Sequence, residues 1–145
     1  MIKILSSTAT KPSTSFTDQQ RKKGEDNLQW LIRNLPSEDR SHLVMVGGKS
    51  PTDFRLRVAQ SHLRHDMAPS HWSHAFLLGK IGKNAASATA HEISLQPQDG
   101  FGFPPPTNGV QKGKVGRYAN PDEYPNIAVL GVPVAQDEVL KALDR

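Results

Sequence analysis

Hydrophobic residues recur at helical spacing near the start of the chain. Four of them stand at positions i, i+3, i+4 and i+7 between Leu28 and Leu35, which places them on one face of a helix. Thr17 suits the N-cap of this helix, and Pro36 follows the last apolar position. The pattern therefore predicts a long N-terminal helix over residues 17–35.

In the middle of the chain, turns separate short runs that are either continuously apolar or alternately apolar and polar, which is typical of a sheet. These patterns predict strands at residues 42–46, 54–60, 71–81, 88–95 and 126–134. Short turns containing Gly, Asn and Pro join the runs, so the strands should pair largely antiparallel. Helical spacing returns in a short C-terminal helix over residues 136–145. We therefore expect an α+β fold with a curved, largely antiparallel sheet, a long N-terminal helix and a short C-terminal helix.

The composition suits one globular domain. The chain has 145 residues, of which 36% are hydrophobic and 22% charged, so it can build one core and is not typical of a disordered protein. Residues 1–15 are rich in Ser and Thr, and we expect a flexible segment there, ahead of one α+β domain over residues 16–145. No apolar run approaches the ~20 residues of a membrane helix, and no signal peptide is evident. We expect a cytoplasmic protein without a membrane partner.

A glycine pair follows the first predicted strand. The stretch GGKS at residues 47–50 ends like a phosphate-binding loop, but the earlier glycine of that motif is replaced by Leu43. A strand pattern starts at Phe54, so we expect no helix N-terminus behind this loop. We interpret residues 47–51 as a turn.

Four of the six histidines form the pattern HxxH-x5-HxxH. Neutral imidazole is a good ligand for zinc, and a nearby carboxylate can add an oxygen ligand. His62, His65 and His71 with Asp66 are therefore candidate zinc ligands. The alternative is that these residues are ordinary polar loop residues. Zinc is the one cofactor that the sequence suggests, and otherwise we expect none.

The fourth of these histidines, His74, lies inside an apolar predicted strand, WSHAFLL. A buried histidine needs hydrogen-bond partners, and Glu92 lies in the next predicted strand. If the two strands form a hairpin, His74 and Glu92 share one face, whereas His91 points the other way. The carboxylate would fix the tautomer of the imidazole, which gives the base and orienting group of a nucleophilic site. The alternative is a core histidine whose hydrogen bonds are satisfied.

A strand with SHAFLL, a paired strand with Glu92, a loop with Gly109-Val110 and a closing strand IAVLGV follow one another. This order resembles the circularly permuted papain-like amidohydrolases related to NlpC, over roughly residues 42–134. The resemblance implies that His74 matches the catalytic histidine and Glu92 a recurrent acidic position. The family's cysteine nucleophile comes later, at the start of a helix, and this sequence contains no cysteine. The resemblance therefore implies an inactive scaffold, or one that another chain completes.

The basic residues suggest an acidic partner. The net charge is +4, and a basic excess favours association with phosphate-rich or acidic molecules. Candidate contacts to nucleic acid or to a protein partner are Arg55, Arg57, Lys112, Lys114 and Arg117. The aromatic content is only 6%, and no known nucleic-acid-binding motif is present.

Three functions are compatible with these observations. The first is a non-catalytic accessory subunit on a papain-like scaffold, which binds another protein through the Pro- and Phe-rich loop 97–109 and the arginines. The second is a hydrolase that uses His74 and Glu92 with a metal ion or with a nucleophile from a partner chain. The third is a nucleic-acid-binding subunit. The absence of cysteine makes catalysis by this chain alone the least expected.

Overall fold

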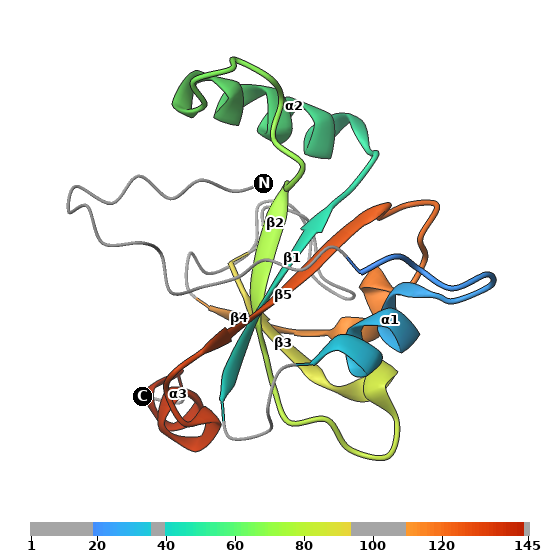
Figure 1. Ribbon diagram of the computed structural model, residues 1–145. Coiled ribbons are helices and arrows are strands. Elements are labelled where there is room, and N and C mark those ends of the chain that lie inside the picture. Colours follow the sequence, from blue (N-terminus) through green and yellow to red (C-terminus); the bar gives the residue numbers. More distant parts are fainter. Residues whose placement is uncertain (1–18, 36–39, 94–109, 144–145) are drawn as a thin grey trace.

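The computed structural model describes residues 19–35, 40–93 and 110–143, which form an α+β fold (Figure 1). The helices are α1, α2 and α3, the strands are β1 to β5, and three short 3-10 helices are η1 to η3. In chain order they are α1 (Asn27–Asn34), β1 (Ser41–Gly47), α2 (Pro51–Ala59), η1 (Gln60–Leu63), β2 (His74–Leu78), η2 (Ala85–Ser87), β3 (Thr89–Glu92), β4 (Gln111–Lys114), η3 (Val115–Tyr118), β5 (Asn126–Val132) and α3 (Gln136–Leu143).

The five strands form one antiparallel sheet in the order β4-β3-β2-β1-β5. Each strand from β1 to β3 pairs with the next strand in the sequence, although a helix separates β1 from β2. The last strand returns to pair with β1 along seven consecutive residues. The expected antiparallel sheet is confirmed, as are the predicted strands at β1, β2, β3 and β5 and the C-terminal helix at α3. β2 is shorter than the predicted run 71–81.

One face of the sheet builds the core. α1, η2 and η3 lie over this face in Figure 1, and α1 contributes Leu28, Trp30 and Leu31. The sheet residues directly beneath them have very low exposure, and Val44 and Val46 have none. The core also contains Phe76, Leu78, Ala88, Ala90, Val115 and Tyr118. Because side chains alternate along a strand, the opposite face carries the residues between these.

The N-terminal helix is shorter than predicted, because its start is set by a cap and not by the apolar pattern. Gly24 adopts a left-handed backbone with φ of 76°, which a turn needs and a helix does not allow. Asp26 then caps α1 by accepting from the backbone N–H of Gln29, whose side chain bonds back to the Asp26 N–H. The predicted start at Thr17 lies outside the described residues.

The predicted strand at 54–60 is wrong, because this segment forms α2. Ser50 caps α2 by accepting from the Asp53 backbone N–H, and Pro51 occupies the first helical turn, where proline is favoured. Phe54 and Val58 are 58% and 37% exposed, so their alternation does not reflect burial against a sheet. The expectation that no helix begins after residues 47–50 is wrong for the same reason.

β4 was not predicted, because its sequence QKGK has neither apolar alternation nor β-branched residues. It becomes a strand by pairing with β3 at the edge of the sheet. The loop 97–109 and the segment 1–15 lie outside the described residues. Among the helices that the structure describes, none combines the length and apolar character needed to cross a bilayer.

Candidate active site

The hairpin of β2 and β3 brings His74 and Glu92 together. Phe76 pairs directly with Glu92, so His74 lies two residues away on the same face of the sheet. The imidazole Nε2 is 2.6 Å from Glu92 Oε2, a short charge-assisted hydrogen-bond distance. The predicted contact is confirmed. His91 pairs with Leu77 and belongs to the other face, also as predicted.

Three donors surround the Glu92 carboxylate, whose side chain is fully buried. Besides His74, the Tyr118 hydroxyl donates to Oε2 at 2.5 Å, and Arg117 Nη1 lies 3.4 Å from Oε1. A buried carboxylate is tolerated when several donors satisfy its oxygens. Glu92 is therefore held as a hydrogen-bond acceptor at the boundary between the core and the imidazole.

Tyr118 ties this cluster to the core. Its ring stacks at 5.8 Å on His74 and at 5.0 Å on Phe76, and the Arg117 guanidinium lies 5.5 Å from the ring centroid. Burial, together with the hydrogen bond to Glu92, raises the pKa of the Tyr118 phenol far above its ordinary value. The phenol thus stays protonated and donates to the carboxylate at every physiological pH.

Sequence reasoning missed the positions of these two η3 residues. Arg117 was predicted to contact a partner, but its guanidinium lies beside Glu92. The sequence does not predict a role for Tyr118 in this site, because η3 follows β4, a strand that has no apolar pattern. Only the hairpin register and the return of the chain along β4 place the two side chains here.

The contact assigns a chemical role to each ring nitrogen of His74. When Nε2–H donates to Glu92, the neutral imidazole keeps its lone pair on Nδ1. The His74 side chain is 18% exposed, whereas the carboxylate behind it is not exposed at all. An imidazole oriented from the inside and reachable from the outside can accept and return a proton.

The serine next to His74 in the sequence has a structural role. Ser73 precedes His74 on the chain and is buried. Its hydroxyl oxygen accepts from the Gly48 backbone N–H at 3.0 Å and lies 3.4 Å from the Val46 carbonyl oxygen. Ser73 therefore links the start of β2 to the end of β1.

The predicted zinc ligands are not assembled in the described residues. His62 lies in η1, His65 and Asp66 lie in the turn after it, and His71 precedes β2. Both Asp66 oxygens bind Arg64, at 2.9 and 2.6 Å, and this contact holds the pKa of Asp66 well below its ordinary value. Over residues 19–35, 40–93 and 110–143, no three His, Asp or Glu side chains are grouped as a metal site requires.

The predicted basic contacts are divided between separate elements. Arg55 is exposed on α2, and Lys112 and Lys114 are exposed on β4 at the sheet edge. Arg57 instead turns toward the protein, where its Nε donates at 2.7 Å to a backbone carbonyl ahead of β2. With Arg117 beside the buried carboxylate, two of the five residues serve the fold or the site.

Comparison with protein-family models, curated proteins and solved structures gives no match for this chain. The resemblance to papain-like amidohydrolases therefore stays a prediction. The structure itself defines an α+β protein in which a buried, multiply bonded glutamate orients a partly exposed histidine.

Proposed function

We propose that this chain is an accessory subunit that contributes the proton-transfer half of a hydrolytic site. His74 is the general base and Glu92 its orienting carboxylate, while a second chain supplies the nucleophile. The observation that carries the proposal is the 2.6 Å contact between Nε2 and a carboxylate oxygen that has no solvent exposure. The proposal places the nucleophile on another chain because the sequence contains no cysteine and, in the described part of the chain, the serine next to His74 is bound by the backbone.

The reaction follows from the tautomer. A hydroxyl or thiol of the partner loses its proton to Nδ1 of His74 as it attacks a carbonyl carbon. Glu92 stabilises the imidazolium that forms, and Tyr118 keeps the carboxylate in place. The imidazolium then gives the proton to the leaving group as the bond between that group and the carbonyl carbon breaks. The same imidazole next takes a proton from a water molecule, which attacks the acyl group left on the partner, and returns it to the nucleophile as that bond breaks. A metal-based version has less support, because the candidate zinc ligands are separated.

The proposal is tested on the chain purified with the proteins that accompany it in its native source. Hydrolysis of amide, ester and thioester substrates is measured for the natural complex and for variants. His74→Ala should lower kcat/KM by about 10²–10⁴-fold, the usual contribution of a general base. Glu92→Gln keeps the shape of the side chain but loses the charge, so it should lower kcat and shift the pH profile.

The matched control is His71→Ala, a histidine outside the cluster. This variant should hydrolyse the same substrates at the natural rate. Circular dichroism and thermal unfolding establish that each variant is folded. A folded His74→Ala complex with undiminished hydrolysis, or a natural complex without any hydrolysis, contradicts the proposal.

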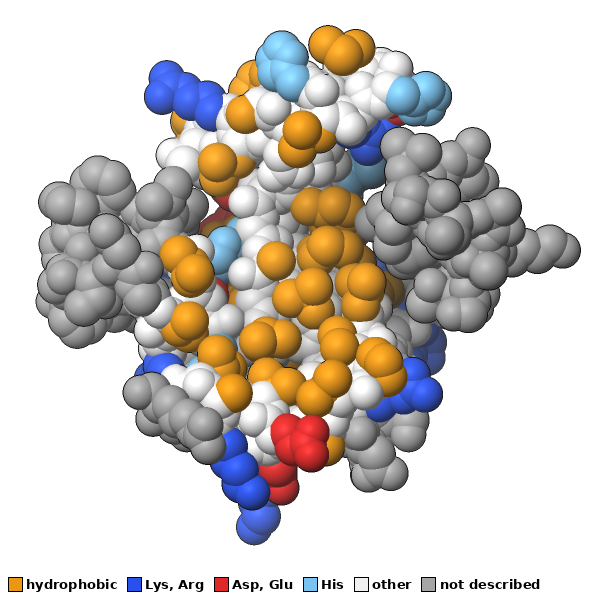
Figure 2. Space-filling model, turned by 90° about the vertical axis from the view of Figure 1, so that its left-hand side faces the viewer, with side chains coloured by type: hydrophobic (Ala, Val, Ile, Leu, Met, Phe, Trp, Pro, Cys, Tyr) orange, Lys and Arg blue, Asp and Glu red, His pale blue; other side chains and the backbone are white. Residues whose placement is uncertain are grey.

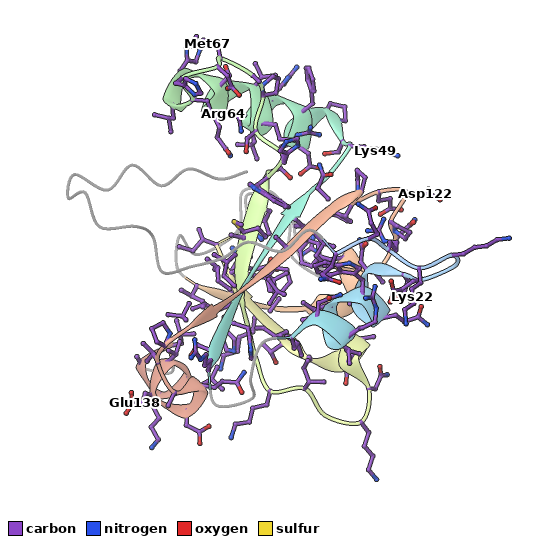
Figure 3. The ribbon with its side chains drawn as sticks, viewed as in Figure 1. Lys22, Lys49, Arg64, Met67, Asp122 and Glu138 are labelled. Carbon is purple, nitrogen blue, oxygen red and sulfur yellow. The ribbon has the colours of Figure 1, made fainter. Side chains whose placement is uncertain are left out.

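A second candidate is a subunit that only binds a protein partner. It is favoured by apolar side chains on α2, η1 and the turn after it, since Phe54, Leu63 and Met67 are 58%, 88% and 59% exposed. These elements, residues 51–67, form one projection, and Figure 3 places Met67 at its end. The backbone of Met67 has a left-handed φ of 52°. Exposed apolar residues gathered on one projection are typical of a protein contact.

Binding and catalysis can be tested separately. Phe54→Ser and Leu63→Ser should reduce recovery of the partner in co-purification without lowering thermal stability, because both side chains are exposed. Val134→Ser is the control, as Val134 is 39% exposed but lies after β5. Equal recovery of the partner by all three variants would exclude this projection as the contact.

A further inference from the structure

The two edges of the sheet differ in charge and in length. β4, at one edge, has four residues, two of which are Lys112 and Lys114. β5, at the other edge, has the seven-residue sequence NIAVLGV, which contains no charged residue and no proline. Lysine at an edge strand discourages pairing with another chain, and a long uncharged edge has no such protection. β5 is therefore the edge at which an additional strand can pair.

The backbone of β5 is regular along its whole length. It pairs with β1 through seven consecutive residues, from Asn126 to Val132, without a bulge. Alternate N–H and C=O groups of an edge strand point away from the sheet. In the described part of the chain, the only further backbone hydrogen bond of this strand is in the turn at its end, where Val132 accepts from Val134.

We propose that β5 pairs antiparallel with β5 of a second copy of this chain, about a two-fold axis at Val129. In this register the two largest side chains of one copy each face a small residue of the other, and Val129 faces Val129 of the second copy. Ile127 lies opposite Gly131 of the second copy, and Ala128 lies opposite Leu130. Because the strand is uncharged, the two copies meet without the like-charge repulsion that a self-pairing strand would otherwise create.

The open face of the sheet continues across this contact. Ala128, Leu130 and Val132 point away from the core and are only partly buried, as are Leu43 and Leu77 beside them. Figure 2 shows hydrophobic side chains gathered along the middle of this face. Pairing of the two edges would join the two apolar faces into one ten-stranded sheet, and so bury the outermost of these side chains. This inference concerns a surface apart from His74 and stands independently of the proposed hydrolysis.

The test is sedimentation equilibrium of the full chain over a range of concentrations. The natural protein should pass from the monomer mass of 15.9 kDa to twice that mass. Leu130→Lys should weaken the dimer by on the order of tenfold or more, because the symmetry repeats the change and brings two lysines to diagonal positions. Leu130→Glu should do the same. An equal mixture of these two variants should recover a dimer, since opposite charges then meet.

The matched control is Leu43→Lys. Leu43 pairs with Leu130 on the same face but belongs to β1, which is not an edge. This variant should keep the dimer. Hydrogen exchange of the natural protein gives a reading that does not depend on any substitution: raising the concentration should protect amides of β5 and leave those of β4 unchanged.

Three results would overturn the inference. The first is a natural protein that stays monomeric at every concentration. The second is a dimer that Leu130→Lys leaves intact or that Leu43→Lys disrupts equally, which would assign the contact to the open face. The third is full protection of the β5 amides in the monomer, which would show that another segment of the same chain occupies the edge.

Discussion

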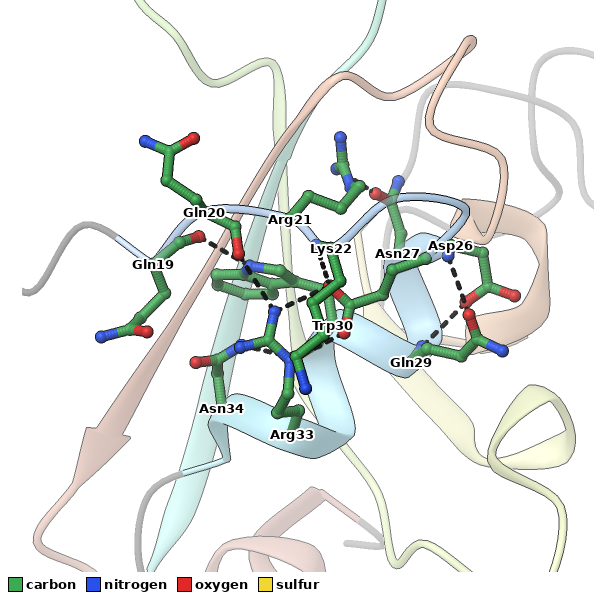
Figure 4. A network of polar contacts seen from close by, with 11 residues as sticks. Gln19, Gln20, Arg21, Lys22, Asp26, Asn27, Gln29, Trp30, Arg33 and Asn34 are labelled. Atoms are coloured by element: carbon green, nitrogen blue, oxygen red, sulfur yellow. Dashed lines mark hydrogen bonds and ion pairs between the residues drawn. The ribbon is translucent and has the colours of Figure 1, made fainter.

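Replacing Asn27 by alanine should be among the most destabilising changes at a polar position of this chain. Asn27 is the first residue of α1 and is completely buried. Its amide nitrogen donates to the carbonyl oxygens of Tyr118 at 2.9 Å and Tyr124 at 2.8 Å, and its amide oxygen accepts from Arg21 at 2.5 Å (Figure 4 shows the Arg21 contact). One side chain therefore attaches α1 to η3 and to the turn before β5.

The expected loss can be worked out from these contacts. Asn27→Ala leaves two carbonyl oxygens without their donor, and a buried polar atom without a partner costs about 1–3 kcal/mol. The Tyr124 contact is only partly buried and belongs to the lower end of that range. The sum is about 2–5 kcal/mol. For a chain of this length, such a change lowers the Tm by roughly 6–15 °C.

Urea unfolding followed by circular dichroism measures this loss. Asn34→Ala is the control: Asn34 lies in the same helix, and within the described residues its side-chain amide bonds to the carbonyl of Trp30 in α1. It should cost no more than about 1 kcal/mol. Asn27→Asp keeps the size but removes both donors, so it should be at least as harmful as Asn27→Ala. If Asn27→Ala unfolds at the same urea concentration as Asn34→Ala, the hydrogen bonds of the Asn27 side chain contribute little to the free energy of unfolding.

Three further outcomes are expected. Tyr118 and Tyr124 are the only tyrosines of the chain, and burial raises the pKa of both. The ultraviolet signal of tyrosinate should therefore appear at higher pH in the folded protein than in the unfolded chain, and the stability that the two phenols contribute should be lost as the pH rises above 10, the ordinary pKa of the unfolded chain. Gly47→Ala would place its Cβ 1.9 Å from a backbone carbonyl oxygen ahead of β2. It should lower the free energy of unfolding, measured in urea, by about 1–3 kcal/mol or more. Gly82→Ala is the control, because its Cβ would meet open space and the free energy of unfolding should change little. A hydrogen bond from Arg33 in α1 lowers the pKa of Glu25 from 4.5 to about 2. The stability that this pair contributes should therefore be present above pH 4.5 and be lost as the pH falls toward 2. Arg33→Ala should remove this part of the dependence of stability on pH.

The apolar pattern was a good guide where burial decides the structure. β1 and β2 lie in the interior of the sheet, and their continuous apolar runs predicted them correctly. The pattern failed where local hydrogen bonds decide. In α2, Ser50 and Pro51 start a helix whose apolar residues remain exposed, so the alternation beginning at Phe54 carried no information about a sheet.

The site was predictable only in its central pair. Side chains alternate between the two faces along each strand, so the positions of His74 and Glu92 in two paired strands place them on the same face, and this predicted their contact. Tyr118 and Arg117 reach the same carboxylate from η3, after a polar strand and beyond residues 94–109. No local pattern encodes that return, because it depends on how β4 pairs with β3.

Tyr118 contributes both to the stability of the core and to the orientation of His74. Its carbonyl receives the amide of Asn27, its ring packs on Phe76 in the core, and its hydroxyl holds the carboxylate that orients His74. Loosening of α1 would therefore also disturb the residue that holds the Glu92 carboxylate beside His74. A random mutant library sorted for thermal resistance, and the same library sorted for whatever reaction His74 supports, should accordingly enrich overlapping sets of positions around this tyrosine.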